Sequence, residues 1–154
     1  MDKNADKQKP IKRIKKIPYA RQDISEEDMK AVRDILSSDY LTQGPMVPHF
    51  EKLVSEYVGV SHAIAVNSAT SALHIACRAL DVKRGDIVWT SPNTFVASAN
   101  SVLYCGASVD FVDIDPKTYN LDATLIEQAI TPRTKAIMPV SLYGQCCDMN
   151  AIND

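Results

Sequence analysis

The chain has 154 residues, of which 45% are hydrophobic, and a formal net charge of -2. A chain of this length buries roughly 70% of its unfolded surface, which suffices for one compact domain. The near-neutral charge provides no general attraction to nucleic acid or to an anionic membrane, so we expect neither as a partner. No apolar run reaches the ~20 residues needed to cross a bilayer and no signal peptide is recognisable, which predicts a cytoplasmic protein.

The N-terminal segment is polar and rich in lysine. Residues 1–16 contain few apolar side chains, and we interpret them as a disordered basic arm, since a solvated tail is a simpler explanation than nucleic-acid binding. The folded part is expected to span residues 17–154. Ser25 precedes Asp28 by three residues, which is the spacing of a helix capping box, and an amphipathic surface helix is predicted to follow.

A second helix is predicted after a break at residues 41–45. The break contains Gly44 and Pro45, and apolar residues then recur at helical spacing until Gly59 ends the helix. The recurring residues are Phe50, Leu53, Val54, Tyr57 and Val58.

The segment from Asn67 to Leu73 joins a short apolar run at 63–66, predicted to be a buried strand, to a helix whose first turn contains small and hydroxyl side chains. The first N–H groups of such a helix have no intrahelical partner, and the helix dipole favours an anion there, so a phosphate is a suitable ligand. Ser68 is equally suited to ordinary helix capping, and on this segment alone the two interpretations stay open. Neither a nucleotide P-loop nor a dinucleotide-binding glycine motif is present.

The rest of the chain alternates between strands and helices, which predicts an α/β fold with a mostly parallel sheet flanked by helices on both faces. The predicted strands lie at residues 63–66, 87–90, 109–114 and 136–140, with helices at 95–105, after Asp122 and after Asp148. Loops at the C-terminal ends of parallel strands meet at one edge of the sheet and form the binding crevice. These loops are expected at 67–71, 91–95, 113–120 and 140–148.

The cysteines and histidines show no metal-binding spacing. Cys77, Cys105, Cys146 and Cys147 contain no Cys-x-x-Cys pair, and we expect reduced, mostly buried thiols. No role is assigned to the three histidines, His49, His62 and His74, and no metal site is expected.

The same loops contain a series of motifs in a characteristic order. The segments are Asp39-Tyr40-Leu41-Thr42-Gln43-Gly44-Pro45, Phe50-Glu51, Asn67-Ser68-Ala69-Thr70-Ser71-Ala72-Leu73, Ser91-Pro92-Asn93-Thr94-Phe95-Val96-Ala97-Ser98-Ala99-Asn100, Val112-Asp113-Ile114-Asp115 and Pro139-Val140-Ser141-Leu142-Tyr143-Gly144-Gln145. With them the chain resembles the DegT/DnrJ/EryC1/StrS family of sugar-nucleotide aminotransferases, which depend on pyridoxal 5'-phosphate (PLP). Residues 67–73 are most similar to members that aminate UDP-linked 4-keto-6-deoxy sugars, including the enzyme of pseudaminic acid synthesis.

The resemblance implies a set of site residues. Ala69 and Thr70, with the hydroxyl of Ser68, are expected to contact the PLP phosphate. Phe95 is expected to stack on the pyridine ring, although core packing is its simpler interpretation. Ser141, where many relatives have His, is a candidate neighbour of the cofactor.

A further residue is expected near the substrate. Thr42 resembles part of the rim of the substrate site in this family, and an ordinary helix stop is the alternative interpretation.

The resemblance also implies what the chain lacks. In the family, a later strand supplies the Asp that pairs with the pyridinium nitrogen and is followed by the Lys that forms the Schiff base, and neither is expected within residues 1–154. Lys83 is expected in a turn, and Lys117 and Lys135 in loops, so no catalytic residue is assigned. Residues 17–154 are therefore expected to be the N-terminal part of the large domain of a fold type I PLP transferase, inactive alone, with the C-terminal part and small domain absent.

Function classes follow from the same resemblance. The intact enzyme is expected to be a cytoplasmic homodimer that moves an amino group from glutamate to a nucleotide-linked keto-sugar, in the synthesis of amino sugars for cell-surface polysaccharides. A PLP-dependent sugar dehydratase of the same family, in which His replaces the Lys, is one alternative. A non-catalytic phosphate-binding or assembly module is the other.

Overall fold

The computed structural model of the protein describes residue 18 and residues 20–154. The predicted basic arm at 1–16 lies outside the described residues. The chain divides into two compact units, with the boundary between Ala63 and Ile64. Each unit is described by itself.

The first unit contains two helices that begin and end where the sequence predicts. Helix α1 (Glu26–Leu36) has the expected capping box, in which the Asp28 N–H donates to Ser25 Oγ at 3.2 Å and the Ser25 N–H donates to Asp28 Oδ2 at 2.8 Å. The Ser25 N–H, together with the Ser25 hydroxyl that donates to Asp28 Oδ2 at 3.0 Å, lowers the pKa of the Asp28 carboxyl. Helix α2 (Met46–Val58) ends at Gly59, whose φ of 73° is the left-handed conformation that glycine adopts without strain.

The second unit contains a parallel sheet of three strands in the order β2-β1-β3. Strand β1 (Ile87–Thr90) lies between β2 (Ser108–Phe111) and β3 (Thr134–Met138), and both pairings are parallel. The predicted α/β class with a parallel sheet is therefore confirmed.

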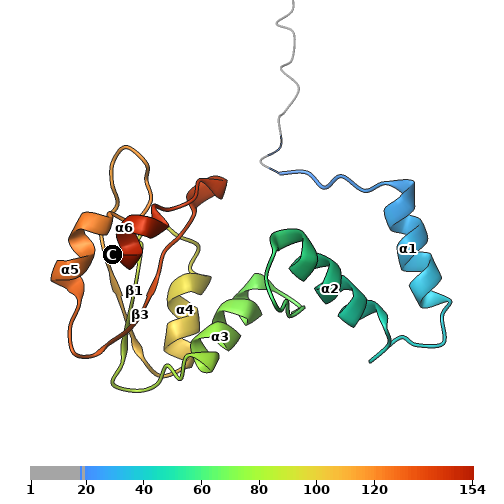
Figure 1. Ribbon diagram of the computed structural model, residues 1–154, viewed down its shortest axis with the longest axis horizontal. Helices are drawn as coiled ribbons and strands as arrows, with labels where there is room; N and C mark the ends of the chain where they lie inside the picture. Colours follow the sequence, from blue (N-terminus) through green and yellow to red (C-terminus); the bar gives the residue numbers. More distant parts are fainter. Residues whose placement is uncertain (1–17, 19) are drawn as a thin grey trace, which may run out of the picture. The chain divides into compact units, whose positions relative to one another are not determined.

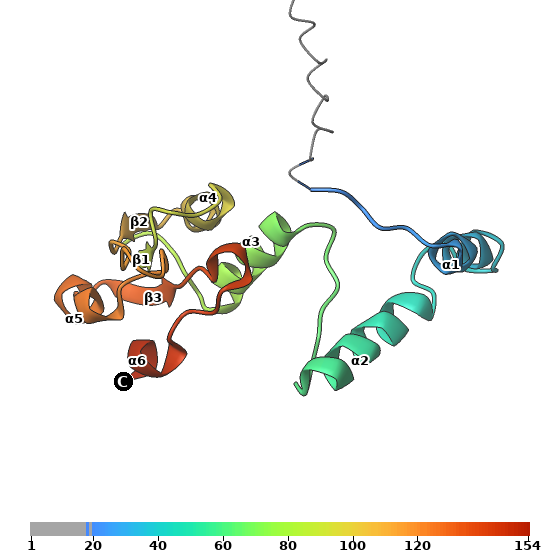
Figure 2. The same ribbon diagram turned by 90° about the horizontal axis from the view of Figure 1, so that it is seen from above.

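Helices cover both faces of this sheet (Figures 1 and 2). Helices α3 (Ala69–Ala79) and α4 (Ala97–Tyr104) lie on one side. Helices α5 (Ile126–Ala129) and α6 (Met149–Asn153) lie on the other. The result is a three-layer arrangement, in which the central strand β1 is largely buried and β2 is mostly exposed.

The core follows from the alternation of side chains along the strands. Val88 of β1 packs with Cys77 of α3 and Val102 of α4, whereas the next residue, Trp89, packs against a second cluster that includes Ile126 of α5. Val88 and Val102 are almost completely buried. The two clusters fix α3 and α4 on one face of the sheet and α5 on the other.

Two short helices are capped as predicted. Asp122 precedes the 3₁₀ turn η1 (Ala123–Leu125), and its Oδ1 accepts a hydrogen bond from the Thr124 N–H at 2.9 Å. Asp148 precedes α6, and its Oδ1 accepts from the Ala151 N–H at 3.1 Å. Both caps satisfy N–H groups that a helix start leaves unpaired.

The predicted strand at residues 63–66 is wrong. This segment joins none of the three strands of the sheet, and the Ile64 side chain is 76% exposed. An extended segment becomes a strand only when a neighbouring strand receives its ladder of hydrogen bonds. An apolar run predicts the tendency to be buried, but it does not supply that neighbour.

The four cysteines are free thiols in different environments. Cys77 and Cys147 are buried, Cys105 is half-buried and Cys146 is exposed. Burial raises the pKa of the Cys105 thiol, which lowers its thiolate fraction. The expectation of free thiols agrees with the structure. The expectation that most of them are buried holds only for Cys77 and Cys147.

The thiols should therefore react with iodoacetamide in a defined order at mildly alkaline pH. Cys146 should be alkylated first, because thiolates react and its side chain is accessible. Peptide mass spectrometry of timed samples would measure the order, and the variant Cys146→Ser should lose the fast phase. Alkylation of Cys105 before Cys146 would contradict this assignment.

None of the helices among the described residues is long and apolar enough to cross a membrane. In the same part of the chain, no group of three or more His, Cys, Asp or Glu side chains is arranged to hold a metal ion.

Candidate functional site

Hydrogen bonds among neighbouring side chains fix the turn at the N-terminus of α3. Ser68 caps the helix, its Oγ accepting from the Ser71 N–H at 3.2 Å. The Ser71 hydroxyl donates to Asn67 Oδ1 at 2.7 Å and contacts Ser68 Oγ at 3.0 Å. Because a hydroxyl has one hydrogen, Ser68 is the donor in the contact with Ser71. The Ser68 hydroxyl therefore shapes the turn, and its contact with a ligand stays a prediction.

The other two predicted phosphate contacts, Ala69 and Thr70, lie at this helix start. Ala69 and Thr70 occupy the first two positions of α3, where backbone N–H groups lack intrahelical acceptors. Ala69 is exposed and Thr70 is half-buried. Within the described part of the chain, the Thr70 hydroxyl has no hydrogen-bond partner. Together they present two N–H groups and a hydroxyl at the positive end of a helix dipole.

The charge at this helix start contrasts with that of α1. The first turn of α1 contains three acidic residues, Glu26, Glu27 and Asp28, which occupy the positive end of its own dipole. The first turn of α3 contains no acidic residue. An external anion at α3 therefore meets no carboxylate from the first turn of the helix.

The loop after β1 presents Phe95 to the surface. Asn93 N–H donates to the buried Ser91 Oγ at 3.2 Å, and the hydroxyls of Thr94 and Ser98 are 2.8 Å apart. These contacts hold the loop against α4. The Phe95 ring is 75% exposed, so the interpretation of Phe95 as a core residue is wrong, and its role in stacking on a cofactor stays a prediction.

The loops after β2 and β3 are joined through one buried side chain. Asn120, which is 4% exposed, donates from Nδ2 to the Gln145 carbonyl at 3.0 Å and to the Cys146 carbonyl at 3.2 Å. Its Oδ1 accepts from the Leu142 N–H at 3.1 Å. The neighbouring Thr118 carbonyl accepts from Gln145 Nε2 at 3.3 Å.

The three loops that follow the strands meet at one cavity of about 540 Å³. Its lining residues come from all three loops: Asn93, Thr118, Tyr119, Leu142, Tyr143 and Gln145. The predicted rim is thus formed by the loops at 91–95, 113–120 and 140–148. The loop at 67–71 contributes no residue to this cavity.

None of the six predicted site residues, Thr42, Ser68, Ala69, Thr70, Phe95 and Ser141, lines this cavity. Ser141 is exposed and immediately precedes the turn η2 (Leu142–Gly144), so it lies beside the cavity-lining Leu142 in the chain. Thr42 lies in an exposed bend between α1 and α2 in the first unit. The role of Thr42 stays a prediction.

Sequence reasoning did not identify Asn120, Tyr119 or Tyr143. Asn120 contacts residues 22 to 26 positions away, and no local pattern predicts such partners. Tyr119 and Tyr143 have φ values of 61° and 51°, a left-handed conformation that is uncommon for non-glycine residues and is found in strained turns.

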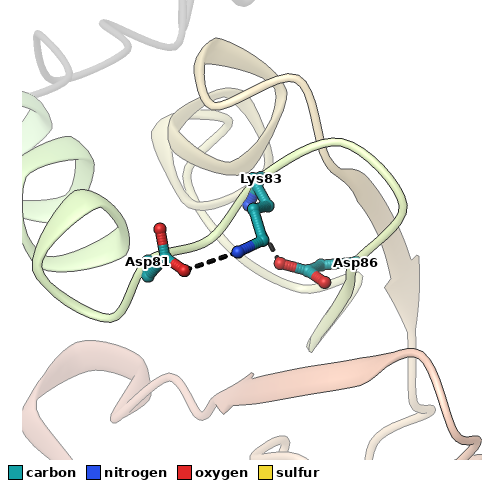
Figure 3. A network of polar contacts seen from close by, with 3 residues as sticks. All are labelled: Asp81, Lys83 and Asp86. Atoms are coloured by element: carbon teal, nitrogen blue, oxygen red, sulfur yellow. Dashed lines mark hydrogen bonds and ion pairs between the residues drawn. The ribbon is translucent and has the colours of Figure 1, made fainter.

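The lysines of the second unit differ in their surroundings. Lys83 Nζ lies 2.7 Å from Asp81 Oδ2, and the backbone N–H of Lys83 donates to Asp86 Oδ2 at 2.9 Å (Figure 3). The hydrogen bond and charge of Asp81 raise the pKa of Lys83, which disfavours the neutral amine that a nucleophile requires. Lys117 is in a loop as predicted, but Lys135 lies in β3, because the strand starts at Thr134, two residues before the predicted start at 136.

Residues 22–154 match the model of the DegT/DnrJ/EryC1/StrS aminotransferase family. GDP-perosamine synthase of Caulobacter vibrioides is 56% identical over 109 residues, which cover 71% of this chain and 29% of the relative. The chain spans about a third of the length of the curated relatives that it matches.

Two solved structures share the arrangement of the chain. Spr1654 from Streptococcus pneumoniae, solved in a PLP form and a PMP form, superposes with a TM-score of 0.86 at 38% identity and covers 89% of this chain and 35% of its own. PseC of Helicobacter pylori, an aminotransferase involved in the biosynthesis of pseudaminic acid, superposes with a TM-score of 0.85 at 36% identity. The match covers 90% of this chain and 38% of the PseC chain.

Proposed function

Since the chain belongs to the DegT/DnrJ/EryC1/StrS aminotransferase family, we propose that it provides the phosphate-binding part of a PLP site in a sugar aminotransferase. The observation that carries this proposal is the helix start at Ala69 and Thr70. Among the described residues, its first N–H groups and the Thr70 hydroxyl have no hydrogen-bond partner, and its first turn contains no acidic residue. A phosphate accepts hydrogen bonds from all of these donors.

The other predicted residues suit the same cofactor. Phe95 presents an exposed ring, which can pack on a flat aromatic ligand. Ser141 follows the last residue of β3 by three positions, in the loop at the same edge of the sheet as the loop of Phe95. When bound, PLP supplies the electron sink that amino-group transfer requires. In this chain's own residues we assign the phosphate to Ala69 and Thr70, with Phe95 and Ser141 beside the ring.

The reaction of the whole enzyme is proposed from its relatives. We propose that the enzyme transfers an amino group from glutamate to a nucleotide-linked keto-sugar, as a cytoplasmic homodimer with Thr42 near the substrate. The names of GDP-perosamine synthase and of PseC support a sugar substrate.

None of the lysines within residues 1–154 is proposed as the residue that holds PLP covalently, so this chain alone should not turn over. The family motifs match no lysine here, and Lys83 is held by Asp81. Borohydride treatment of the chain with PLP should therefore leave no cofactor attached to one specific lysine. Attachment at a single lysine, located by peptide mass spectrometry, would refute this part of the proposal.

The variant Thr70→Val tests the phosphate contact. It removes one hydroxyl and keeps the side-chain shape, and a hydrogen bond to a charged group is worth about 1.5–3 kcal/mol, so PLP affinity should fall about tenfold to a hundredfold. Equilibrium dialysis with PLP measures the affinity. Pyridoxal, which lacks the phosphate, should bind the parent and the variant equally.

A matched control is Ser108→Ala, which removes an exposed hydroxyl from β2 and should not change PLP affinity. Circular dichroism would show that each variant is folded. A folded parent chain that binds no PLP, or a Thr70→Val variant with unchanged affinity, would contradict the proposed site and favour an assembly module.

A further inference from the structure

We propose that the cavity between the loops after β1, β2 and β3 is the sugar subsite of this enzyme, and that it accepts an uncharged sugar ring. This inference rests on the proposed function, because it places the sugar beside the residues assigned to PLP. The cavity of about 540 Å³ lies within the roughly 300–1,000 Å³ that small-molecule sites occupy.

The lining of the cavity is aromatic and neutral. Tyr119 and Tyr143 contribute the two aromatic rings of the lining. As whole residues they are 56% and 86% exposed. Aromatic rings provide large, rigid surfaces for the apolar C–H face of a sugar, and the amides of Asn93 and Gln145 offer donors and acceptors for hydroxyl groups. This combination of a few polar groups with aromatic walls is typical of a small-ligand site.

The lining also argues against an acidic sugar. None of the cavity residues in the described part of the chain has a charged side chain. A carboxylate placed here would lose water without gaining a cationic partner, which is unfavourable. The carboxylate of Asp115, which accepts a hydrogen bond from the lining residue Thr118 at 3.2 Å, would also repel an acidic sugar.

The wall of the cavity is already formed by the protein. Asn120 ties the loop that contains Tyr119 to the loop that contains Tyr143 through three hydrogen bonds. Both tyrosines have left-handed backbone conformations, which persist only where the surrounding structure imposes them. The backbone of both tyrosines is therefore set before a ligand binds, which lowers the entropy cost of binding.

The position of the cavity suits the sugar rather than the diphosphate. Leu142 directly follows Ser141, and Asn93 lies two residues before Phe95, so part of the lining comes from the same two loops as the residues that we place beside the PLP ring. The reacting carbon of the substrate must approach that ring. A diphosphate would instead require the basic groups that this lining lacks.

Isothermal titration of the full chain, in saturating PLP, with UDP-glucose, UDP-glucuronate and UDP tests the inference. The two sugar nucleotides differ only at C6, where a hydroxymethyl group is replaced by a carboxylate. UDP-glucose should bind about tenfold more tightly than UDP-glucuronate or UDP. Tyr143→Ala should reduce the affinity for UDP-glucose to that for UDP, whereas Tyr143→Phe, which keeps the ring, should retain most of it.

Tyr57→Ala is the matched control, because Tyr57 in α2 is 92% exposed and does not line the cavity. It should leave all three affinities unchanged. Equal binding of UDP-glucose and UDP-glucuronate, or unchanged UDP-glucose affinity in folded Tyr143→Ala, would overturn the sugar subsite.

PLP dialysis on the same samples separates the two proposals. If Tyr143→Ala loses the preference for UDP-glucose over UDP but binds PLP normally, the sugar subsite is supported independently of the PLP site. Intact PLP binding without any preference for UDP-glucose over UDP overturns the subsite alone. Absence of PLP binding, with a Tyr143-dependent preference for UDP-glucose, refutes the proposed PLP site and supports the sugar cavity.

Discussion

Replacing Ala69 by glutamate is expected to weaken PLP binding by about a thousandfold, which corresponds to about 4 kcal/mol for two like charges 4 Å apart near a protein surface. Ala69 is exposed and is the first residue of α3. A carboxylate there takes the place at the positive end of the dipole that we assign to the phosphate. For the same reason it stabilises the folded chain, by about 0.3–1 kcal/mol.

The opposite signs of these two effects make the variant informative. A general folding defect would lower both PLP affinity and thermal stability, whereas competition for the helix start lowers only the affinity. Dialysis with PLP and thermal unfolding by circular dichroism measure the two quantities on the same sample.

Ala79→Glu provides the control within the same helix. Ala79 is exposed and lies at the last residue of α3, about 15 Å along the axis from Ala69. Salt at 0.1 M screens exposed charges beyond about 10 Å, so PLP affinity should stay close to that of the parent. Here the carboxylate opposes the dipole and stability should fall slightly. Equal PLP affinities for the two glutamate variants would show that the cofactor phosphate does not bind at the start of α3.

Asn120→Ala is expected to lower the free energy of unfolding of the second unit by on the order of 3 kcal/mol. The variant removes three hydrogen bonds from a side chain that is 4% exposed, and it leaves the Leu142 N–H and the Gln145 and Cys146 carbonyls without that partner. A polar group left unpaired in a buried position costs about 1–3 kcal/mol, and water that reaches the exposed Gln145 and Cys146 recovers part of this.

Urea unfolding followed by tryptophan fluorescence measures this loss, since Trp89 is the single tryptophan of the chain and lies in β1. Asn150→Ala is the control, because Asn150 is exposed in α6; its effect should lie within about 0.5 kcal/mol. Asn120→Asp should also be destabilised, since a carboxylate next to two carbonyl oxygens replaces an amide donor. An Asn120→Ala variant as stable as Asn150→Ala would show that this residue does not hold the two loops together.

Local features of the fold were predictable because the physical cause lies within a few residues. The capping box joins Ser25 to Asp28, Gly59 ends α2 by its own conformation, and Asp148 caps α6 through the N–H three residues ahead. Each of these contacts is determined by local sequence and needs no partner from elsewhere in the chain.

Predictions that depended on distant partners were less complete. The apolar run at 63–66 was predicted to be a strand, but it has no place in the β2-β1-β3 sheet. Phe95 was a plausible core residue by pattern, and the structure exposes it. Hydrophobicity predicts a tendency to be buried, while the available neighbours decide whether burial happens.

By itself, the sequence determined the α/β class, the capped helix starts and the family resemblance, and it led to the prediction of a phosphate site at Ala69 and Thr70. These follow from periodicity, capping chemistry and motifs that are contiguous in the chain. Only the tertiary structure decided that the loops after three strands meet, since parallel pairing brings their C-terminal ends to one edge of the sheet. That meeting places Asn120 opposite residues more than 20 positions away and builds a neutral, aromatic cavity from side chains that no local pattern connects.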